Sequence, residues 1–443
     1  SLQIRPLTGG LSNHLFLVSS NEDKKSSNTS SSSADKLPTV LVRIHPDSPQ
    51  EHQHQNETDG SNGQQSQNTN EVSSFSIVNR EIENRLAAWL ASQSSVPSGC
   101  ASKDCNTATK LAPTVYGRFE NGRVEEFYTN VRPLSCPEMK VYARYIAPQM
   151  ASFHQLQDPP KDVLPKPTGK VASLYETIDA WLQEAKTLFS KDGTEQEQHK
   201  NGNVLKHRED LELLHSLSRE WKWLEEQLSN PPPTNNPLEA QAYAFIRRVA
   251  VTHMDCQPLN ILVDNSTENS PPSSSSTSSN NINSEKTNID DDDNNDTGNV
   301  NLRLIDFEYS GWNPVAADIA NTFCEYCEMS NLKADYEKEY PSPTQQDDFF
   351  WHYYCAQRHY DGPFHCLPLA SNGCYYDRKS AEWNVVSRAL QQEVGRFSLV
   401  SHLSWAVWSI LKSKEEDGVD FDYMFYARHR MDGYAWAKAK FFG

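Results

Sequence analysis

The stretch Val251–Asn265, VTHMDCQPLNILVDN, sets a histidine, an aspartate and an asparagine at fixed intervals before an apolar, strand-like run. This spacing is typical of a catalytic loop in which Asp255 accepts a hydroxyl proton, Asn260 offers an amide oxygen to Mg²⁺, and His253 holds the loop by hydrogen bonds. An Asp and an Asn in a turn can instead cap backbone groups. The stretch alone leaves both interpretations open.

A third polar residue of this kind follows downstream, in LRLIDFEYSGWNP (Leu302–Pro314). Asp306 ends an apolar run, where a carboxylate is costly to bury unless it is paired or bound to metal. We therefore predict that Asp306 is a magnesium ligand. Asp318 lies at an expected helix start, where a helix cap or a structural salt bridge is the simpler interpretation.

Upstream, TGGLSNH (Thr8–His14) places paired glycines directly before a strand. Glycines let backbone N–H groups approach phosphate oxygens, with Ser12 as an added donor, although two glycines can also form a plain turn. Arg43, in VLVRIH, either faces solvent or clamps phosphate. In the second case a Glu of the next helix holds its guanidinium; Glu83 is slightly favoured over Glu81, and surface pairing is the alternative for both.

Aromatic residues near the end of the chain supply a substrate hypothesis. Trp405 and Trp408 lie three apart on one helical face, and such stripes are usually core. The alternative is an aromatic cage for a quaternary ammonium, stabilised by cation-π attraction of about 2 kcal/mol when desolvated. Glu325 adds a compensating carboxylate, and further rings come from segments that can meet the Trp pair: Tyr309, Phe421, Tyr423 and Tyr426.

Charge and composition exclude several classes of partner. The formal net charge is −18, and no basic stripe alternates with aromatic residues, so a nucleic acid or an anionic lipid surface is not expected to bind. No apolar run reaches the roughly twenty residues of a membrane span. No signal peptide is visible, so we expect a cytoplasmic protein with reduced thiols. The CxxC formed by Cys324 and Cys327 then reads as buried core thiols rather than a metal site.

The expected elements form two parts. Strands at His14–Ser19 and Thr39–His45, a helix at Asn79–Ala91 and a hairpin about Asn121-Gly122 indicate a small antiparallel sheet with one helix. From Pro137 onward the pattern is largely helical, interrupted by two strand-like runs that can pair with each other. The two strand-like runs are Asn260–Asp264 and Leu302–Tyr309. The expected helices are Met139–Leu156, Leu174–Phe189, Arg208–Leu228, Leu238–Val249, Gln391–Lys412 and Tyr423–Lys440.

Taken together, these blocks resemble the choline/ethanolamine kinase family. LTGGLSNHLF, VLVRIH, APTVYGRFENGRVEEFY, VTHMDCQPLNIL, LRLIDFEYSGWNPVAADIANTFCEY and EVGRFSLVSHLSWAVWSILKSK follow one another in that family's order. The resemblance implies an α+β, protein-kinase-like bilobal fold with a small antiparallel-sheet N-lobe and a large, mostly helical C-lobe. It also implies phosphorylation of an amino alcohol with ATP and Mg²⁺.

Carried over by position, the resemblance assigns roles to individual residues. Asp255 becomes the catalytic base, with Asn260 and Asp306 as magnesium ligands. The ATP-binding set is Thr8, Gly9, Gly10, Leu11, Ser12, Asn13, His14, Arg43, Glu83, Glu126, Phe127, Gln257 and Asp306, and the choline-binding set is Tyr309, Glu325, Trp405, Trp408, Phe421 and Tyr426.

Three features depart from the family. The loop reads HMD where the family usually has HND, so Met254 removes an amide that braces the loop. An insertion lengthens the connection between the Asp255 loop and Asp306. The segment Asp335–Asp377 matches the family poorly, and its irregularly spaced His and Cys residues favour a surface loop over a metal site.

We therefore predict a choline kinase with an N-lobe at 1–130 and a C-lobe at 131–443. Low-complexity insertions at about 20–36, 46–74 and 265–300 are expected to be disordered, because they lack the apolar side chains that offset ordering entropy. Ethanolamine kinase is the nearest alternative, and an inactive kinase-like binding protein is the second. An aminoglycoside phosphotransferase is a weaker third, because it leaves the Trp pair unexplained. A homodimer is compatible with the sequence, which does not decide it.

Overall fold

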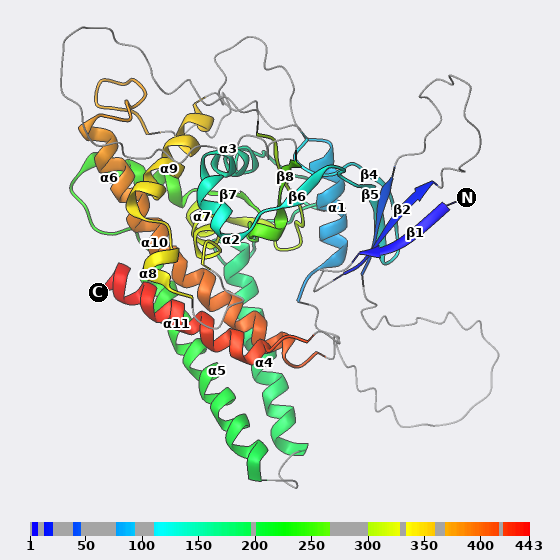
Figure 1. The fold of residues 1–443 in the computed structure, drawn as a ribbon. Helices are drawn as coiled ribbons and strands as arrows, with labels where there is room; N and C mark the ends of the chain where they lie inside the picture. Colours follow the sequence, from blue (N-terminus) through cyan, green and yellow to red (C-terminus); the bar gives the residue numbers. More distant parts are fainter. Residues whose placement is uncertain are drawn as a thin grey trace, which may run out of the picture.

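The computed structural model describes residues 2–7, 13–20, 39–45, 77–93, 110–195, 201–265, 300–327, 334–358, 368–415 and 420–443, with backbone alone at 191–195 and 201–207 (Figure 1). Of the predicted glycine loop Thr8–His14, residues 8–12 lie outside the described part of the chain, and Asn13 and His14 lie within it. The three predicted insertions also lie outside it, apart from their outermost residues.

The first part of the chain forms a five-stranded antiparallel sheet, β1-β2-β3-β5-β4, with one helix, α1 (Arg80–Ala91), beside it (Figure 1). The pairing of the two predicted strands across the first insertion is confirmed. The first strand was not predicted, because Pro6 and an exposed edge position weaken its alternation. The strands are β1 (Leu2–Leu7), β2 (His14–Ser20), β3 (Val40–Ile44), β4 (Val115–Phe119) and β5 (Gly122–Glu126).

The predicted hairpin about Asn121-Gly122 is also confirmed, since it joins β4 to β5. Glycine is required at this turn because a Cβ on Gly122 would lie 2.2 Å from the carbonyl oxygen of Arg43. The hairpin therefore packs its turn directly against β3, the strand that carries Arg43.

The second part is mainly helical and contains two small antiparallel sheets. One sheet is β6-β8-β9 and the other is β7-β10, and the predicted pairing of the two late strand-like runs is confirmed by β8 and β9. The strands are β6 (Val131–Pro133), β7 (Val249–Thr252), β8 (Ile261–Asp264), β9 (Leu302–Leu304) and β10 (Gly311–Pro314), and the helices are α2 (Cys136–Val141), α3 (Ala143–Phe153), α4 (Ser173–Glu195), α5 (Asn201–Leu228), α6 (Pro237–Arg247), α7 (Val315–Cys324), α8 (Tyr336–Glu339), α9 (Pro343–Gln357), α10 (Ala381–Lys412) and α11 (Tyr423–Phe442).

The interpretation of Asp335–Asp377 as a surface loop is wrong for most of its described residues. Helix α9 begins with a capping box between Ser342 and Gln345, and it buries Phe349 and Phe350 completely. The dense aromatic composition hid the helical period, because both faces of this helix are apolar in places. Two boundaries also shift: Val249 starts β7 rather than ending a helix, and β9 stops at Leu304.

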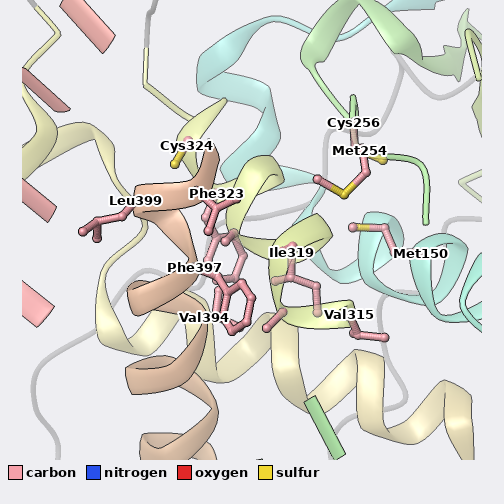
Figure 2. Close-up of a cluster of buried hydrophobic side chains, with 14 of the residues drawn as sticks. Met150, Met254, Cys256, Val315, Ile319, Phe323, Cys324, Val394, Phe397 and Leu399 are labelled. Carbon is pink, nitrogen blue, oxygen red and sulfur yellow. The ribbon is translucent and has the colours of Figure 1, made fainter. Parts of the chain in front are cut away.

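A continuous core joins the helices to the stretch that opened the sequence analysis. Figure 2 shows Phe323 of α7 and Phe397 of α10 in one cluster of buried side chains, with Met254 and Cys256 at its edge. Cys324 and Cys327 are both buried in this core, as predicted for the CxxC. Within the described part of the chain, we find no helix with the length and hydropathy needed to cross a membrane.

Candidate active site

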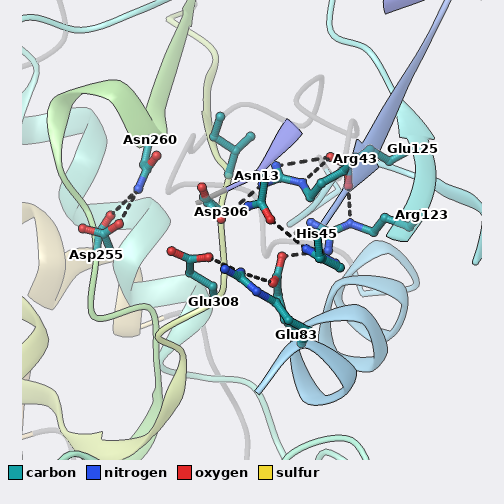
Figure 3. A network of polar contacts seen from close by, with 12 residues as sticks. Asn13, Arg43, His45, Glu83, Arg123, Glu125, Asp255, Asn260, Asp306 and Glu308 are labelled. Carbon is teal, nitrogen blue, oxygen red and sulfur yellow. Dashed lines mark hydrogen bonds and ion pairs between the residues drawn. The ribbon is translucent and has the colours of Figure 1, made fainter. Parts of the chain in front are cut away.

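Asp255 lies in a loop that is fixed at both ends by sheet pairing. Strand β7 leads into it and pairs with β10, and a single 3-10 turn, η1 (Pro258–Asn260), leads out of it into β8. Asn260 Nδ2 donates to Asp255 Oδ2 at 2.7 Å and to the Asp255 carbonyl oxygen at 3.0 Å (Figure 3). Both acceptors require the NH₂ group of the amide, so the Asn260 oxygen is left for another partner.

Asp318 braces the backbone of this loop. Its carboxylate accepts from the backbone N–H of His253 at 2.9 Å, from the backbone N–H of Met254 at 2.7 Å, and from His154 Nε2 at 2.9 Å. Burial alone would raise the pKa of Asp318, but the His154 bond and charge together with the loop N–H groups outweigh it and lower that pKa. Asp318 is thus a loop-positioning residue, a role narrower than the cap or salt bridge that the sequence offered.

The Met254 departure proves to be compatible with a braced loop. Met254 has a φ of 65°, in the left-handed region that Asn adopts more readily than Met. Besides the Asp318 bond to its N–H, its carbonyl oxygen accepts from Asn321 Nδ2 at 3.0 Å. Since both braces act through the backbone, the loop does not depend on an amide side chain at this position.

The Asp255 carboxyl has an elevated pKa. Burial raises it first, and the negative charges of Glu325, Asp306 and Glu308 raise it further, while the Asn260 bond acts in the opposite direction. A carboxylate of this kind is a stronger base than an exposed one. A cation that binds nearby would stabilise the ionised form of this carboxyl.

Arg43 is buried and faces two carboxylates, Glu125 at 3.4 Å and Asp306 at 3.5 Å (Figure 3). The predicted pairing of Arg43 with Glu83 is wrong. Glu83 pairs with Arg123 at 2.8 Å and with Arg80 at 2.9 Å.

Strand register explains this exchange of partners. Arg43 of β3 stands opposite Arg123 of β5, and Glu125 follows two residues later on the same face. Glu125 therefore accepts from both guanidiniums. Burial alone would lower the pKa of Arg43, but Asp306, Glu125 and Glu83 raise it, so Arg43 carries a fixed positive charge.

Carboxylate oxygens suited to a divalent cation gather next to Asp255. Within the described residues, Glu83, Asp306 and Glu308 bring ligand atoms within 4.8 Å of one another. Asp306 Oδ1 is buried and makes no hydrogen bond, although it lies 3.5 Å from Arg43 Nη1, and Asp306 has a φ of 66°. Burial and the charge of Asp306 raise the pKa of Glu308 to about 7. Both Glu83 oxygens are already paired with Arg123 and Arg80, so Asp306 and Glu308 are the carboxylates of this group that suit magnesium.

The predicted aromatic residues are in mutual contact. Trp405 lies 5.1 Å from Tyr309 and 5.4 Å from Trp408 between ring centroids, and Phe421 lies 5.5 Å from Tyr426. Trp408 Nε1 donates to the Tyr309 hydroxyl at 2.8 Å. The rings are thus fixed in place before any ligand enters.

A single cavity of about 920 Å³ collects most of the predicted site residues. Phosphate-side, catalytic and aromatic groups all line it, but Glu83 and His14 are not among its lining residues. The predicted residues that line it are Asn13, Arg43, Glu126, Phe127, Asp255, Gln257, Asn260, Asp306, Tyr309, Glu325, Trp405, Trp408, Phe421 and Tyr426.

Sequence reasoning missed Arg430 of α11. Its buried guanidinium donates to Glu325 at 3.0 Å and contacts the Tyr426 hydroxyl at 3.4 Å. No local pattern marks it, because its partner lies 105 residues away. Glu125 and Arg123 had a usable signal, namely their alternation along β5.

The positive charge of Arg43 and the buried carboxyl of Asp255 face one cavity, between a small antiparallel sheet and a mainly helical part. This is the arrangement of a kinase-like phosphotransferase. The family model described as choline/ethanolamine kinase matches residues 103–435. The chain therefore belongs to the choline/ethanolamine kinase family and is an ATP-dependent kinase acting on an alcohol.

Individual relatives agree with this assignment. The chain is 27% identical to probable choline kinase 1 of Arabidopsis thaliana over 75% of its length and 70% of that protein. It is 29% identical to choline kinase alpha of Mus musculus over 74% of its length and 58% of that protein. It is 26% identical to the choline/ethanolamine kinase of Homo sapiens, over 73% of this chain and 64% of that one.

A solved structure supports the fold. The choline kinase of Cryptosporidium parvum Iowa II superposes with a TM-score of 0.57 at 21% identity, covering 99% of this chain and 89% of that one. The predicted protein-kinase-like fold is thereby confirmed. The lobe boundary at 130/131 stays a prediction.

Proposed function

We propose that this kinase transfers the γ-phosphoryl group of ATP to the hydroxyl of choline, giving phosphocholine and ADP. The observation that carries this proposal is the shared cavity, in which an aromatic cage opens onto the same space as Asp255 and Arg43. A trimethylammonium held by the cage can turn its hydroxyl toward the base.

The hydrogen-bonding state of the cage favours choline over ethanolamine. A primary ammonium needs several acceptors, whereas a quaternary ammonium needs only aromatic faces and negative charge. Several cage acceptors already have a partner, since one Glu325 oxygen and the Tyr426 hydroxyl accept from Arg430 and the Tyr309 hydroxyl accepts from Trp408. Ethanolamine would have to compete with these bonds.

In the proposed mechanism, Asp255 accepts the proton of the choline hydroxyl as that oxygen attacks the γ-phosphorus. Asn260 holds one Asp255 oxygen, which leaves Oδ1 for the substrate. Arg43, fixed by Glu125, offers a permanent positive charge to the phosphate groups. Gln257, Glu126 and Phe127 are proposed to contact the nucleotide, as is the predicted loop Thr8–His14.

We further propose that magnesium is the metal cofactor. The Asn260 oxygen and Asp306, the ligands that the family resemblance implies, would hold it, and Glu308 brings a further carboxylate close to Asp306. When bound, it neutralises charge on the transferring phosphoryl group. A homodimer and a cytoplasmic location stay predictions.

An ADP-release assay across choline, its mono- and dimethyl precursors and ethanolamine tests this function. We expect kcat/KM to rise with methylation and to be highest for choline, with no turnover when magnesium is chelated. ADP release that no amino alcohol stimulates would overturn the proposal, and it would favour a kinase-like binding protein.

A further inference from the structure

A second cavity, of about 540 Å³, lies next to the first. Its walls come from the residues leading into α1, the loop before α4, α4 itself, and the segment after Asp306. Glu308, Tyr309 and Trp405 line both cavities, whereas Trp408 lines only the first. Met254 also lines the second cavity, so that space reaches the catalytic loop.

Two aromatic side chains, Tyr309 and Trp405, lie at the border of the two cavities, and we call this pair the aromatic partition. The Tyr309 and Trp405 rings meet at 5.1 Å and 71° between their planes. Trp405 Nε1 donates to Asn321 Oδ1 at 2.8 Å, which fixes the indole. Because Tyr309 and Trp405 line both spaces, their rings lie where the two cavities adjoin.

The second cavity suits an apolar group rather than a second cation. Ile82, Leu174 and Trp181 give it apolar walls. Its two acidic side chains already have partners: Glu308 pairs with Arg80, and Glu176 accepts from the backbone N–H groups of the 168–170 loop. Positive charge therefore has less to gain there than a hydrocarbon or phenyl group has.

We propose that the second cavity is a subsite for a large substituent on the nitrogen of the acceptor alcohol, and that Trp405 closes it and so sets the upper size of that substituent. This inference rests on the proposed function, because it takes the cage as the seat of the ammonium. With the indole present, methyl groups fill the cage. Without it, the two spaces become continuous and a benzyl group can be buried.

The test compares choline with its N-benzyl-N,N-dimethyl analogue in the wild type, Trp405→Ala and Trp408→Ala. Both substitutions remove one indole from the cage, so both are expected to weaken choline binding. Only Trp405→Ala should shift the ratio of the two dissociation constants toward the benzyl compound, on the order of tenfold to a hundredfold, because only it opens the second cavity. Titration calorimetry measures binding without requiring turnover.

A cavity-filling variant separates opening from general loosening of the cage. Thr177 of α4 lines only the second cavity. Thr177→Phe alone should leave choline kinetics unchanged, and combined with Trp405→Ala it should remove the gain for the benzyl compound. Equal ratios in the two Trp variants, or a gain that survives Thr177→Phe, would overturn the partition. Failure of the proposed function would give a different result. The wild type would then not phosphorylate choline, whether or not Trp405→Ala, with or without Thr177→Phe, binds the benzyl compound.

Discussion

Substitution of Asp318 by Asn should weaken the hydrogen bonds that hold the catalytic loop while leaving the proposed catalytic groups in the sequence. Asp318 touches no proposed substrate, yet its carboxylate accepts from the backbone of His253 and Met254 and from His154. An amide has one acceptor atom, so its NH₂ group would face a buried donor. Hydrogen bonds to charged groups contribute about 1.5–3 kcal/mol each, which predicts a loss of unfolding free energy of about 3 kcal/mol.

Thermal unfolding and steady-state kinetics measure the two consequences. A loss of about 3 kcal/mol lowers the melting midpoint by roughly 3–4 °C in a protein of this size. Because displacement of a catalytic group by about 1 Å can cost up to about a hundredfold in rate, kcat should fall tenfold or more. Asp432→Asn, on an exposed position of α11, is the matched control and should change neither quantity.

The same variant has a predicted pH dependence. The pKa of Asp318 is lowered in the folded protein, so its contribution is fully present above its ordinary value of 3.8 and is lost as pH falls through the folded value. The stability difference between wild type and Asp318→Asn should thus be constant near neutrality and shrink below about pH 4. A variant that melts with the wild type and turns over at its rate would refute the assignment of Asp318 as a brace.

Four further predictions concern the loop and the cage. Asp255→Asn should lower kcat by about a hundredfold or more in the ADP-release assay while still binding choline in calorimetry. Met254→Asn should keep kcat within about twofold of wild type in that assay, because the loop braces act through the backbone; a large gain in kcat would instead return importance to the side chain. Trp408→Phe should raise the KM for choline by up to about tenfold with little change in kcat, since it weakens the cage and frees the Tyr309 hydroxyl. Glu325→Gln should raise KM and lower the melting midpoint, because it leaves the buried Arg430 without its carboxylate; an unchanged melting curve would count against that ion pair.

The catalytic loop and its sheet could be predicted because their signals are local. Asp255 and Asn260 lie five residues apart across one turn, and the dipeptide Asn121-Gly122 is by itself enough to indicate the hairpin turn. Such features depend on nearest neighbours in the chain. The structure brings these residues to the places that the sequence indicated.

Partners from distant segments could not be predicted in the same way. Arg43 was given the wrong Glu because the choice between Glu83 and Glu125 depends on the register of β3 with β5, not on either strand alone. Arg430 reaches Glu325 from α11 through tertiary packing. Helix α9 was taken for a loop because its aromatic residues blur the helical period. In the two arginine cases the deciding interaction joins residues 82 and 105 positions apart, whereas the α9 prediction failed on local composition.

The product formed from ATP, magnesium and choline tests the central claim most directly. Phosphorus NMR of the wild-type reaction should show phosphocholine accumulating in a one-to-one ratio with ADP, and no such signal with Asp255→Asn. Accumulation of inorganic phosphate with ADP, or an ATP spectrum unchanged by choline, would contradict the account.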